Sequence, residues 1–455
     1  MSMVGIVDRR RHCCRAGFVL VVVGACTAAS LVNSQEARAE GLSKIERERS
    51  RVMLKVIKDD IKKHYYDRAF HGVKLEARFA EADSRLHEAT SIAHAFGIIG
   101  QALLDFDDSH TFFIPPPRTN RVDYGWQVQM IGEKCNVIAV KPGSDAEAKG
   151  LRVGDIVHSI NGFTPARDTL WKMKYSYYMI RPLPGMRIVA ESPGGPAREI
   201  DVMAEVRQGK RVLDLTGTDE GVDISSVIRD VESEDRLHRQ RHWEAGADLI
   251  IWKMPEFDDD ESSVDRMMDK VRAHKALVLD LRGNTGGSAK TLERLAGYFF
   301  DKDLKIADLK GAKPMKPLLA KSRGRDAYAG KLVVVVDSQT ASASEIFARL
   351  VQIEKRGTVL GDRTAGAVMQ AVYHGHHLGV DKIVLYGASI TDADAIMSDG
   401  KSLEKVGVVP DELLLPSAQD LAGRRDPALA RAAELAGTNI DAVKAGTLFP
   451  LEWQD

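Results

Sequence analysis

Two apolar strands, each followed by a loop of small residues and then by a helix, constrain this chain more than any other feature. The run LVVVV at 332–336 shows no polar alternation, which indicates a strand buried on both faces. It leads into the loop DSQTASASE at 337–345, after which apolar residues recur with helical spacing. The run LVLDL at 277–281 leads in the same way into RGNTGG at 282–287 and a helical run. The sequence therefore predicts an α/β fold with a ligand site beyond the ends of these strands.

Ser342 lies in the first of these loops, between the strand and the N-terminus of the helix. Backbone N–H groups and the helix dipole favour an anion at such a place, and acyl transfer requires one. Either unit alone is more often ordinary α/β architecture than a catalytic centre. The two units together indicate a single crevice.

The composition is that of an ordinary globular protein. The chain has 455 residues, of which 44% are hydrophobic and 28% charged, and its formal net charge is −1. This length allows about two to four domains. The charge balance gives no indication of nucleic acid as a partner.

The sequence predicts no metal site and no cofactor. The run HGHH at 374–377 lacks neighbouring carboxylate or cysteine ligands, so a cluster at a strand edge is the better interpretation. Beyond residue 39 the only cysteine is Cys135, which adjoins an apolar run and is expected to be a buried, inert thiol.

The N-terminal residues 1–39 are predicted to be a secretory signal peptide. Arginines at 9–11 precede an apolar stretch at 16–32, and Ala-Arg-Ala at 37–39 offers small residues for cleavage. We expect export to the periplasm or the cell exterior with cleavage. Two alternatives stay open: a lipobox-like VGAC would leave Cys26 lipidated, or the stretch, close to the lower limit of about 17 residues for spanning a bilayer, would remain as an anchor. Membrane contact is expected only through this segment.

A helical segment is predicted for residues 40–120. It carries Ser109-His110 in the loop DFDDSHT at 105–111, and the prolines at 115–117 must end any helix. Histidine is the usual general base, but spacing alone makes a loop histidine bonded to a neighbouring carboxylate the commoner interpretation of His110.

Residues 121–207 are predicted to form a separate β-rich module. The stretches GLRVGDIV at 150–157 and Ile-Asn-Gly at 160–162 give turn, strand and hairpin signals. This segment resembles a PDZ domain, a class that binds chain termini by adding the peptide as a strand. The resemblance implies a polypeptide partner bound through its C-terminus. It places the carboxylate loop near Tyr124-Gly125-Trp126, which does not match the usual glycine-containing loop cleanly.

The rest of the chain divides into three parts. Residues 208–248 are polar and charged and are predicted to be a linker with some helix. Residues 249–436 are the predicted catalytic core, ending in an amphipathic helix, and residues 437–455 are a short tail.

Nearly all of the sequence from about residue 50 to residue 436 resembles the C-terminal processing (tail-specific) serine protease family. The motifs that carry this resemblance are LDLRGNTGG at 279–287, TASASE at 340–345 and GVVPD at 407–411, in the family's order. The resemblance implies a core of crotonase-like spiral form with an inserted PDZ-like domain. It also implies that Ser342, rather than Ser344 or Ser338, is the nucleophile.

One position departs from the bacterial tail-specific branch, in which a lysine is the base. The matching stretch here is GDRTAGA at 361–367, so Ala367 occupies the lysine position. The tricorn-like branch of the family uses an upstream histidine assisted by a second serine and a glutamate. That branch implies His110 as base, with Ser109 and Glu404 orienting it.

The activity implied is that of a serine endopeptidase with an acyl-enzyme intermediate on Ser342. Backbone N–H groups of Ala343 and of Gly286 or Gly287 would stabilise the oxyanion. A catalytically inactive PDZ-containing peptide-binding pseudoprotease, and an esterase using the same serine, are the alternatives.

Four charged or polar residues near these loops are given structural roles. Asp280, Arg282 and Asn284 are expected to shape the glycine loop through hydrogen bonds. Glu345 is expected to act as a first-turn partner of the helix dipole.

Overall fold

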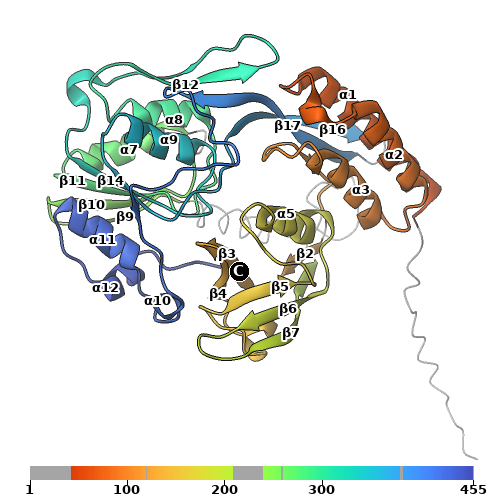
Figure 1. Cartoon of the computed structure of the whole chain (residues 1–455), viewed down its shortest axis with the longest axis horizontal. Coiled ribbons are helices and arrows are strands. Elements are labelled where there is room, and N and C mark those ends of the chain that lie inside the picture. The colour runs from red at the N-terminus through yellow and green to blue at the C-terminus, as the bar shows by residue number, and fades with distance from the viewer. Residues whose placement is uncertain (1–41, 119, 209–238, 258–259, 380–382, 454–455) are drawn as a thin grey trace, which may run out of the picture. The chain divides into compact units, whose positions relative to one another are not determined.

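The computed structural model describes residues 42–118, 120–208, 239–257, 260–379 and 383–453. The predicted signal peptide with Cys26, and most of the predicted linker, lie outside these described residues. The described chain is a mixed α/β structure (Figure 1).

Three helices open the described chain and pack together beside strand β17. They are α1 (Lys44–His64), α2 (Leu75–His87) and α3 (Ile92–Leu104), with a 3₁₀ turn, η1, at Phe70–Gly72. Helix α1 begins with a capping box between Ser43 and Glu46, which satisfies N–H groups that the first turn leaves unpaired. The buried faces of the three helices share one apolar cluster with residues of β1 and β17.

A five-stranded antiparallel sheet with its own core follows. Its strands, in spatial and chain order, are β3 (Trp126–Ile131), β4 (Lys134–Val140), β5 (Ile156–Ile160), β6 (Gly185–Glu191) and β7 (Ala197–Met203). Its helices are α4 (Asp145–Ala148), α5 (Leu170–Lys174) and the π-helical turn η2 (Tyr175–Ile180), and β2 (Asn120–Asp123) pairs with β8 (Glu205–Gln208) beside it. Among the described residues β3 pairs only with β4, so no other strand covers its outer edge. The interpretation of this module as PDZ-like stays a prediction.

The central sheet has six strands and carries the two loops singled out above. In spatial order the strands are β18 (Glu412–Leu413), β15 (Thr358–Gly361), β14 (Lys331–Val336), β11 (Ala276–Asp280), β10 (Leu249–Lys253) and β9 (Arg241–Ala245). All neighbours are parallel except β9, which runs antiparallel to β10.

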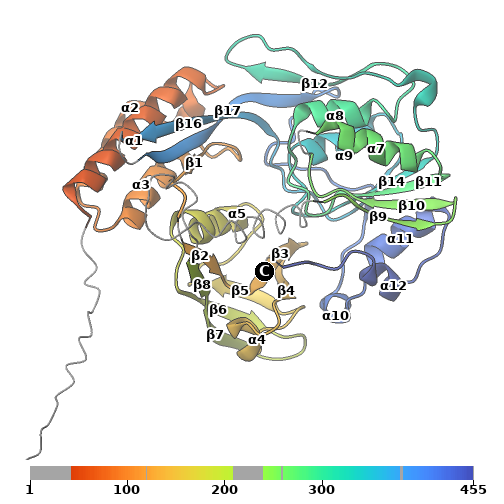
Figure 2. The same cartoon turned by 180° about the vertical axis from the view of Figure 1, so that it is seen from behind.

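Helices cover both faces of this sheet (Figures 1 and 2). One face packs on α7 (Glu261–Val271), α8 (Ala289–Ala296) and α9 (Ala343–Ile353), and the other on α11 (Pro427–Ala436) and α12 (Ala442–Thr447). Alternate residues of β14 enter opposite clusters, Val334 and Val336 on one side and Val333 and Val335 on the other. This explains the unbroken apolar run, because each fully buried aliphatic side chain contributes about 1.5–3 kcal/mol.

A second antiparallel sheet connects the helical segment to the core. It consists of β1 (Phe112–Ile114), β12 (Leu304–Gly311), β13 (Leu318–Ala320), β16 (Met369–Leu378) and β17 (Val384–Met397). The remaining short elements are η3 (Gly324–Asp326) and α10 (Ala418–Ala422). Strand β17 pairs with β1, with β12 and with β16, so the residues just after His110 are fixed to the core sheet system.

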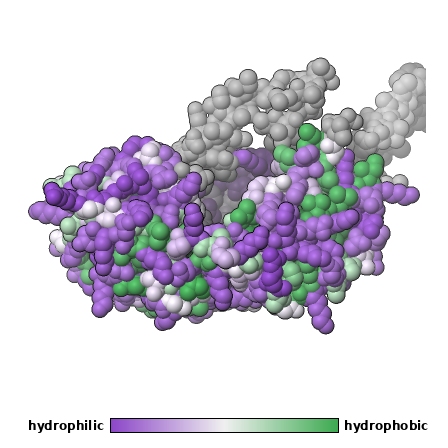
Figure 3. Space-filling model, turned by 90° about the horizontal axis from the view of Figure 1, so that it is seen from above, coloured by the Kyte–Doolittle hydropathy of each residue, from purple (hydrophilic) through white to green (hydrophobic). Residues whose placement is uncertain are grey.

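Two observations refine the predicted domain boundaries. Strand β9 lies inside the segment expected to be a linker and extends the central sheet at its edge, and α12 lies inside the expected tail and packs on α11. Cys135 is buried, and burial raises the pKa of its thiol to about 12, as an inert thiol requires. None of the helices within the described ranges is long and apolar enough to cross a membrane. The face in Figure 3 is largely hydrophilic, with hydrophobic residues in separate patches.

Candidate active site

Ser342 has an unusual backbone conformation at the turn from β14 into α9. Its φ of 56° and ψ of −122° are seldom adopted by a residue with a side chain and cost about 1–3 kcal/mol. Its N–H donates to the carbonyl of Ala367 at 2.8 Å and to the carboxylate of Glu345 at 3.1 Å, which hold it in place. Ser342 is partly exposed and forms a capping box with Glu345, in which its side-chain oxygen faces the backbone N–H of Glu345. The turn therefore presents a partly exposed hydroxyl at a helix N-terminus.

The glycine loop lies directly against this serine. A Cβ atom on Gly286 would come within 2.6 Å of the Cβ of Ser342, and one on Gly287 within 2.1 Å of the carbonyl oxygen of Phe257. Both glycines have positive φ, of 97° and 135°. Only glycine satisfies both the backbone conformation and this close approach.

The three predicted oxyanion donors are not equivalent. The N–H of Gly286 donates to the side-chain oxygen of Asn284 at 2.9 Å, so it is already engaged. The N–H groups of Ala343 and Gly287 make no hydrogen bond within the described part of the chain. Of the expected set, these two amides are the ones available to a substrate oxygen.

Glu345 is more deeply placed than a dipole partner at the surface of a helix. Its carboxylate is fully buried and accepts hydrogen bonds from the N–H groups of Ser342, Gly366 and Ala367 and from the hydroxyl of Thr364. Burial raises the pKa of Glu345 to about 7, against these four donors, which lower it. Glu345 therefore joins the nucleophile turn to the loop that contains Ala367.

Ser109, His110 and Glu404 are brought together from distant parts of the chain. The hydroxyl of Ser109 lies 2.7 Å from Nδ1 of His110 and 2.9 Å from Oε2 of Glu404, and the N–H of Ser109 donates to Oε1 at 2.9 Å. The single proton of the Ser109 hydroxyl goes to the carboxylate, because a charged acceptor makes the stronger bond. The Ser109 oxygen must then accept from Nδ1–H of His110, so Nε2 keeps its lone pair.

The electrostatics agree with this arrangement. Burial lowers the pKa of His110 below its ordinary value of 6.5, opposed by the nearby carboxylate of Asp108, so the imidazole is neutral at pH 7. Burial also raises the pKa of Glu404, opposed by hydrogen bonds from Val368 and Ser109. Nε2 of His110 makes no hydrogen bond to the residues that the structure describes.

One peptide group connects the two halves of the site. The carbonyl of Ala367 accepts the N–H of Ser342, and the N–H of Val368, in the same peptide unit, donates to Glu404 at 2.8 Å. Position 367, where the lysine-dependent branch of the family would have its base, thus contributes main chain rather than a side chain.

Asp108 has a role that the sequence analysis missed. Its carboxylate accepts the N–H groups of His110 at 2.9 Å and Thr111 at 2.7 Å, together with the hydroxyls of Tyr65 and Thr391. An aspartate two residues before a loop histidine is a known signal for such a turn, and it could have identified this residue.

The predicted peptide-binding loop and the outer edge of β3 already make hydrogen bonds within the protein. Tyr124 and Trp126 are buried, and the N–H of Gly125 donates to Asp123. On the outer edge of β3 the carbonyl of Val128 accepts Lys174, and that of Met130 accepts the hydroxyl of Ser338.

The loop at 337–345, which contains Ser342, therefore contacts the edge of β3 directly through Ser338. The side chain of Gln129 adds a hydrogen bond of 2.7 Å to Asp337.

A charged cavity of about 490 Å³ lies beyond the ends of β10, β11 and β14. Asp280 and Arg282 pair there, and Arg282 also pairs with Asp426. Asn284 accepts the hydroxyl of Ser344 and donates to the carbonyl of Met254. These contacts match the structural roles expected for Asp280, Arg282 and Asn284, and Ser342 is not among the residues that line the cavity.

The fold is mixed α/β, and it places a strained serine turn beside a glycine loop, an arrangement that suits a serine hydrolase. Residues 249–414 match the model described as peptidase family S41. Residues 249–414 therefore make the chain a serine-type peptidase, in agreement with the resemblance to the C-terminal processing family.

One relative is similar to this chain in sequence, and two solved structures share its fold. The chain is 26% identical over 381 residues to a chloroplastic carboxyl-terminal-processing peptidase 2 of Arabidopsis thaliana, covering 78% of this chain and 67% of that protein. Mature CPAF shares the fold with a TM-score of 0.61, at 14% identity over 83% of this chain and 94% of that one. The photosystem II D1 C-terminal processing protease shares it with a TM-score of 0.50, at 18% identity over 88% and 99%.

Proposed function

We propose that the protein is an exported serine endopeptidase in which Ser342 forms the acyl-enzyme and His110 is the general base. The observation that carries this proposal is the hydrogen-bond chain from Glu404 through Ser109 to Nδ1 of His110. This chain leaves Nε2 of His110 as the only unprotonated nitrogen, which is the tautomer that a general base requires.

The reaction follows from these groups. Nε2 of His110 removes the hydroxyl proton while Oγ of Ser342 attacks the carbonyl carbon of the scissile peptide. The negative oxygen that develops is stabilised by the N–H groups of Ala343 and Gly287, each such donor being worth about 3 kcal/mol. The imidazolium then gives its proton to the leaving amine, and water, deprotonated by the same nitrogen, releases the acyl group.

The polypeptide substrate would reach this site as an extended strand. The outer edge of β3 touches the nucleophile loop, and strand addition there would place a bound C-terminus beside Tyr124, Gly125 and Trp126. Such a strand must displace Lys174 and Ser338 from the carbonyls that they now occupy.

We do not favour an inactive peptide-binding protein. Loss of the lysine at position 367 removes one type of base, but the hydrogen-bond chain around His110 offers another.

The first experiment is labelling of the purified protein with a fluorophosphonate probe, whose phosphorus an activated serine attacks with loss of fluoride. The unmodified protein should label, and Ser342→Ala should not. Ser338→Ala, four residues away in the same loop, is the matched control and should still label. Casein digestion then distinguishes a peptidase from an esterase. A folded protein that neither labels nor digests casein would refute the proposal.

A further inference from the structure

A second cluster of histidine and carboxylate side chains lies away from Ser342, between α1 and β16. Asp60 and His64 are four residues apart and therefore share one face of the last turns of α1. His374 lies on β16, and one potential ligand atom from each of the three residues falls within 4.8 Å of the others. The carboxylate that the run at 374–377 lacks in sequence is thus supplied by a helix more than 300 residues away.

The histidines of this cluster are not accounted for by hydrogen bonding. Nε2 of His374 is buried and has no hydrogen-bond partner in the described chain. The rings of His64 and His374 lie 4.3 Å apart, centroid to centroid, so a second basic imidazole is placed where a donor would be needed. A buried polar atom without a partner destabilises the folded protein, and a bound cation would remove that cost.

The neighbouring histidine supports the carboxylate. His376, two residues from His374 and therefore on the same face of β16, places Nε2 at 2.5 Å from Oδ2 of Asp60. A metal-binding group oriented by an outer hydrogen bond is a regular feature of metal sites in proteins. Within the described ranges the other carboxylate oxygen of Asp60 has no hydrogen bond to the protein, so it is left for an ion between the two imidazoles.

We propose that Asp60, His64 and His374 bind a divalent transition-metal ion, with His376 positioning Asp60. Two imidazoles and one carboxylate suit Zn²⁺ and do not suit Ca²⁺ or Mg²⁺, which prefer sets of oxygen ligands. Three protein ligands leave a fourth tetrahedral position for water.

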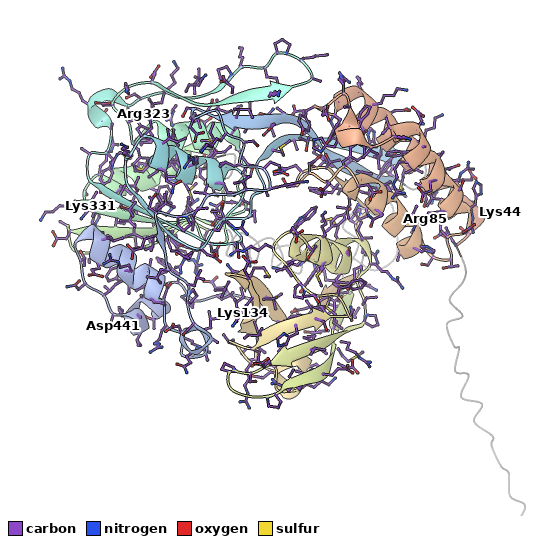
Figure 4. The ribbon with its side chains drawn as sticks, in the orientation of Figure 1. Lys44, Arg85, Lys134, Arg323, Lys331 and Asp441 are labelled. Atoms are coloured by element: carbon purple, nitrogen blue, oxygen red, sulfur yellow. The ribbon has the colours of Figure 1, made fainter. Side chains whose placement is uncertain are left out.

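The ion would hold α1 against β16 next to Tyr65, which is linked through Asp108 to His110, the proposed base. Tyr65 follows His64 directly, and its hydroxyl donates to Asp108 at 2.7 Å. Asp108 in turn holds the N–H of His110. Figure 4 labels Lys44 at the N-terminal end of α1, whereas Asp60 and His64 lie in the last turns of the same helix.

The test uses the full chain, freed of metal with a chelator and titrated with Zn²⁺ and with Co²⁺. We expect one ion per chain, a cobalt absorption spectrum of tetrahedral intensity, and a melting temperature that rises with zinc concentration. His64→Ala and His374→Ala should abolish all three. His376→Ala should weaken affinity about 10- to 100-fold, as loss of an outer-shell partner does.

His377→Ala is the matched control, since His377 is exposed on the opposite face of the same strand. It should bind zinc as the unmodified protein does. If a variant fails to fold, His64→Gln and His374→Gln replace it, with folding checked by circular dichroism. Absence of one-to-one binding, or binding unchanged in folded His64 and His374 variants, would overturn the proposal.

Discussion

The two halves of the candidate site are built in opposite ways. In the nucleophile half, formed by the loops at 282–287 and 337–345, Glu345 stabilises Ser342 from three residues away. In the base half, Glu404 reaches Ser109 across 295 positions of sequence. In the first half, the strained residue Ser342 and its hydrogen-bond partner Glu345 lie in one short segment. The second half forms only when the N-terminal helical segment and the core pack together.

This difference predicts how each half fails. Substitutions in the nucleophile half should lower the reactivity of Ser342 and the free energy of unfolding of the core. Damage to the base half should appear as loss of turnover in a protein that is otherwise folded.

The largest effect is expected from His110→Ala. Without a base the Ser342 hydroxyl is a poor nucleophile, and kcat/KM for a peptide substrate should fall on the order of 10³-fold. Circular dichroism should show a folded protein. His87→Ala, an exposed histidine in the last turn of α2, is the control and should keep full activity. If His110→Ala kept its activity, His110 would not be the general base.

The next effect is on stability, through Glu345→Gln. In the unfolded chain Glu345 releases its proton near pH 4.5, whereas in the folded protein it keeps it to about pH 7. The stabilisation from the retained proton is complete below pH 4.5 and is lost as pH rises to 7, which amounts to about 3 kcal/mol.

Urea unfolding at a series of pH values checks this. The free energy of unfolding of the unmodified protein should fall more steeply from pH 4.5 to 7 than that of Glu345→Gln. Parallel curves would show that the carboxyl is ionised throughout, with its four donors outweighing burial.

A smaller effect is expected from Glu404→Gln. Losing a charge-assisted hydrogen bond costs about 1.5–3 kcal/mol, so kcat should fall about 10- to 100-fold. KM should change little, since the group orients His110 through Ser109 and does not contact substrate. Glu434→Gln, on the exposed side of α11, serves as control. An unchanged kcat would mean that Ser109 alone orients the imidazole.

The smallest effect is the pH dependence of the unmodified enzyme. Because burial holds the pKa of His110 below 6.5, kcat/KM should be flat at neutral pH and decline about tenfold per pH unit below that pKa. A profile of kcat/KM against pH would measure it. A midpoint above 6.5 would contradict a desolvated imidazole.

The same difference between the halves explains what the sequence could predict. The strand, glycine loop and serine turn follow from local patterns, because each is encoded within about ten residues. His110 stood out as a possible base from its residue type, but its assignment, and all of that of Glu404, came from family resemblance. No local rule pairs a loop histidine with a glutamate almost 300 positions away. For the same reason the sequence did not predict the contact of Asp60 with the histidines of β16. It also did not predict β9, which is a strand because it pairs with β10 at the edge of the central sheet.

The peptide between Ala367 and Val368 has one more consequence. A trans peptide is planar, with its C=O and N–H pointing in opposite directions. A half-turn of this plane would point an N–H at the amide of Ser342 and an oxygen at Glu404, so that both contacts become repulsive together. Rotation of this one peptide group would therefore break both contacts in a single step, and amide hydrogen exchange at Ser342 and Val368 should show one common protection.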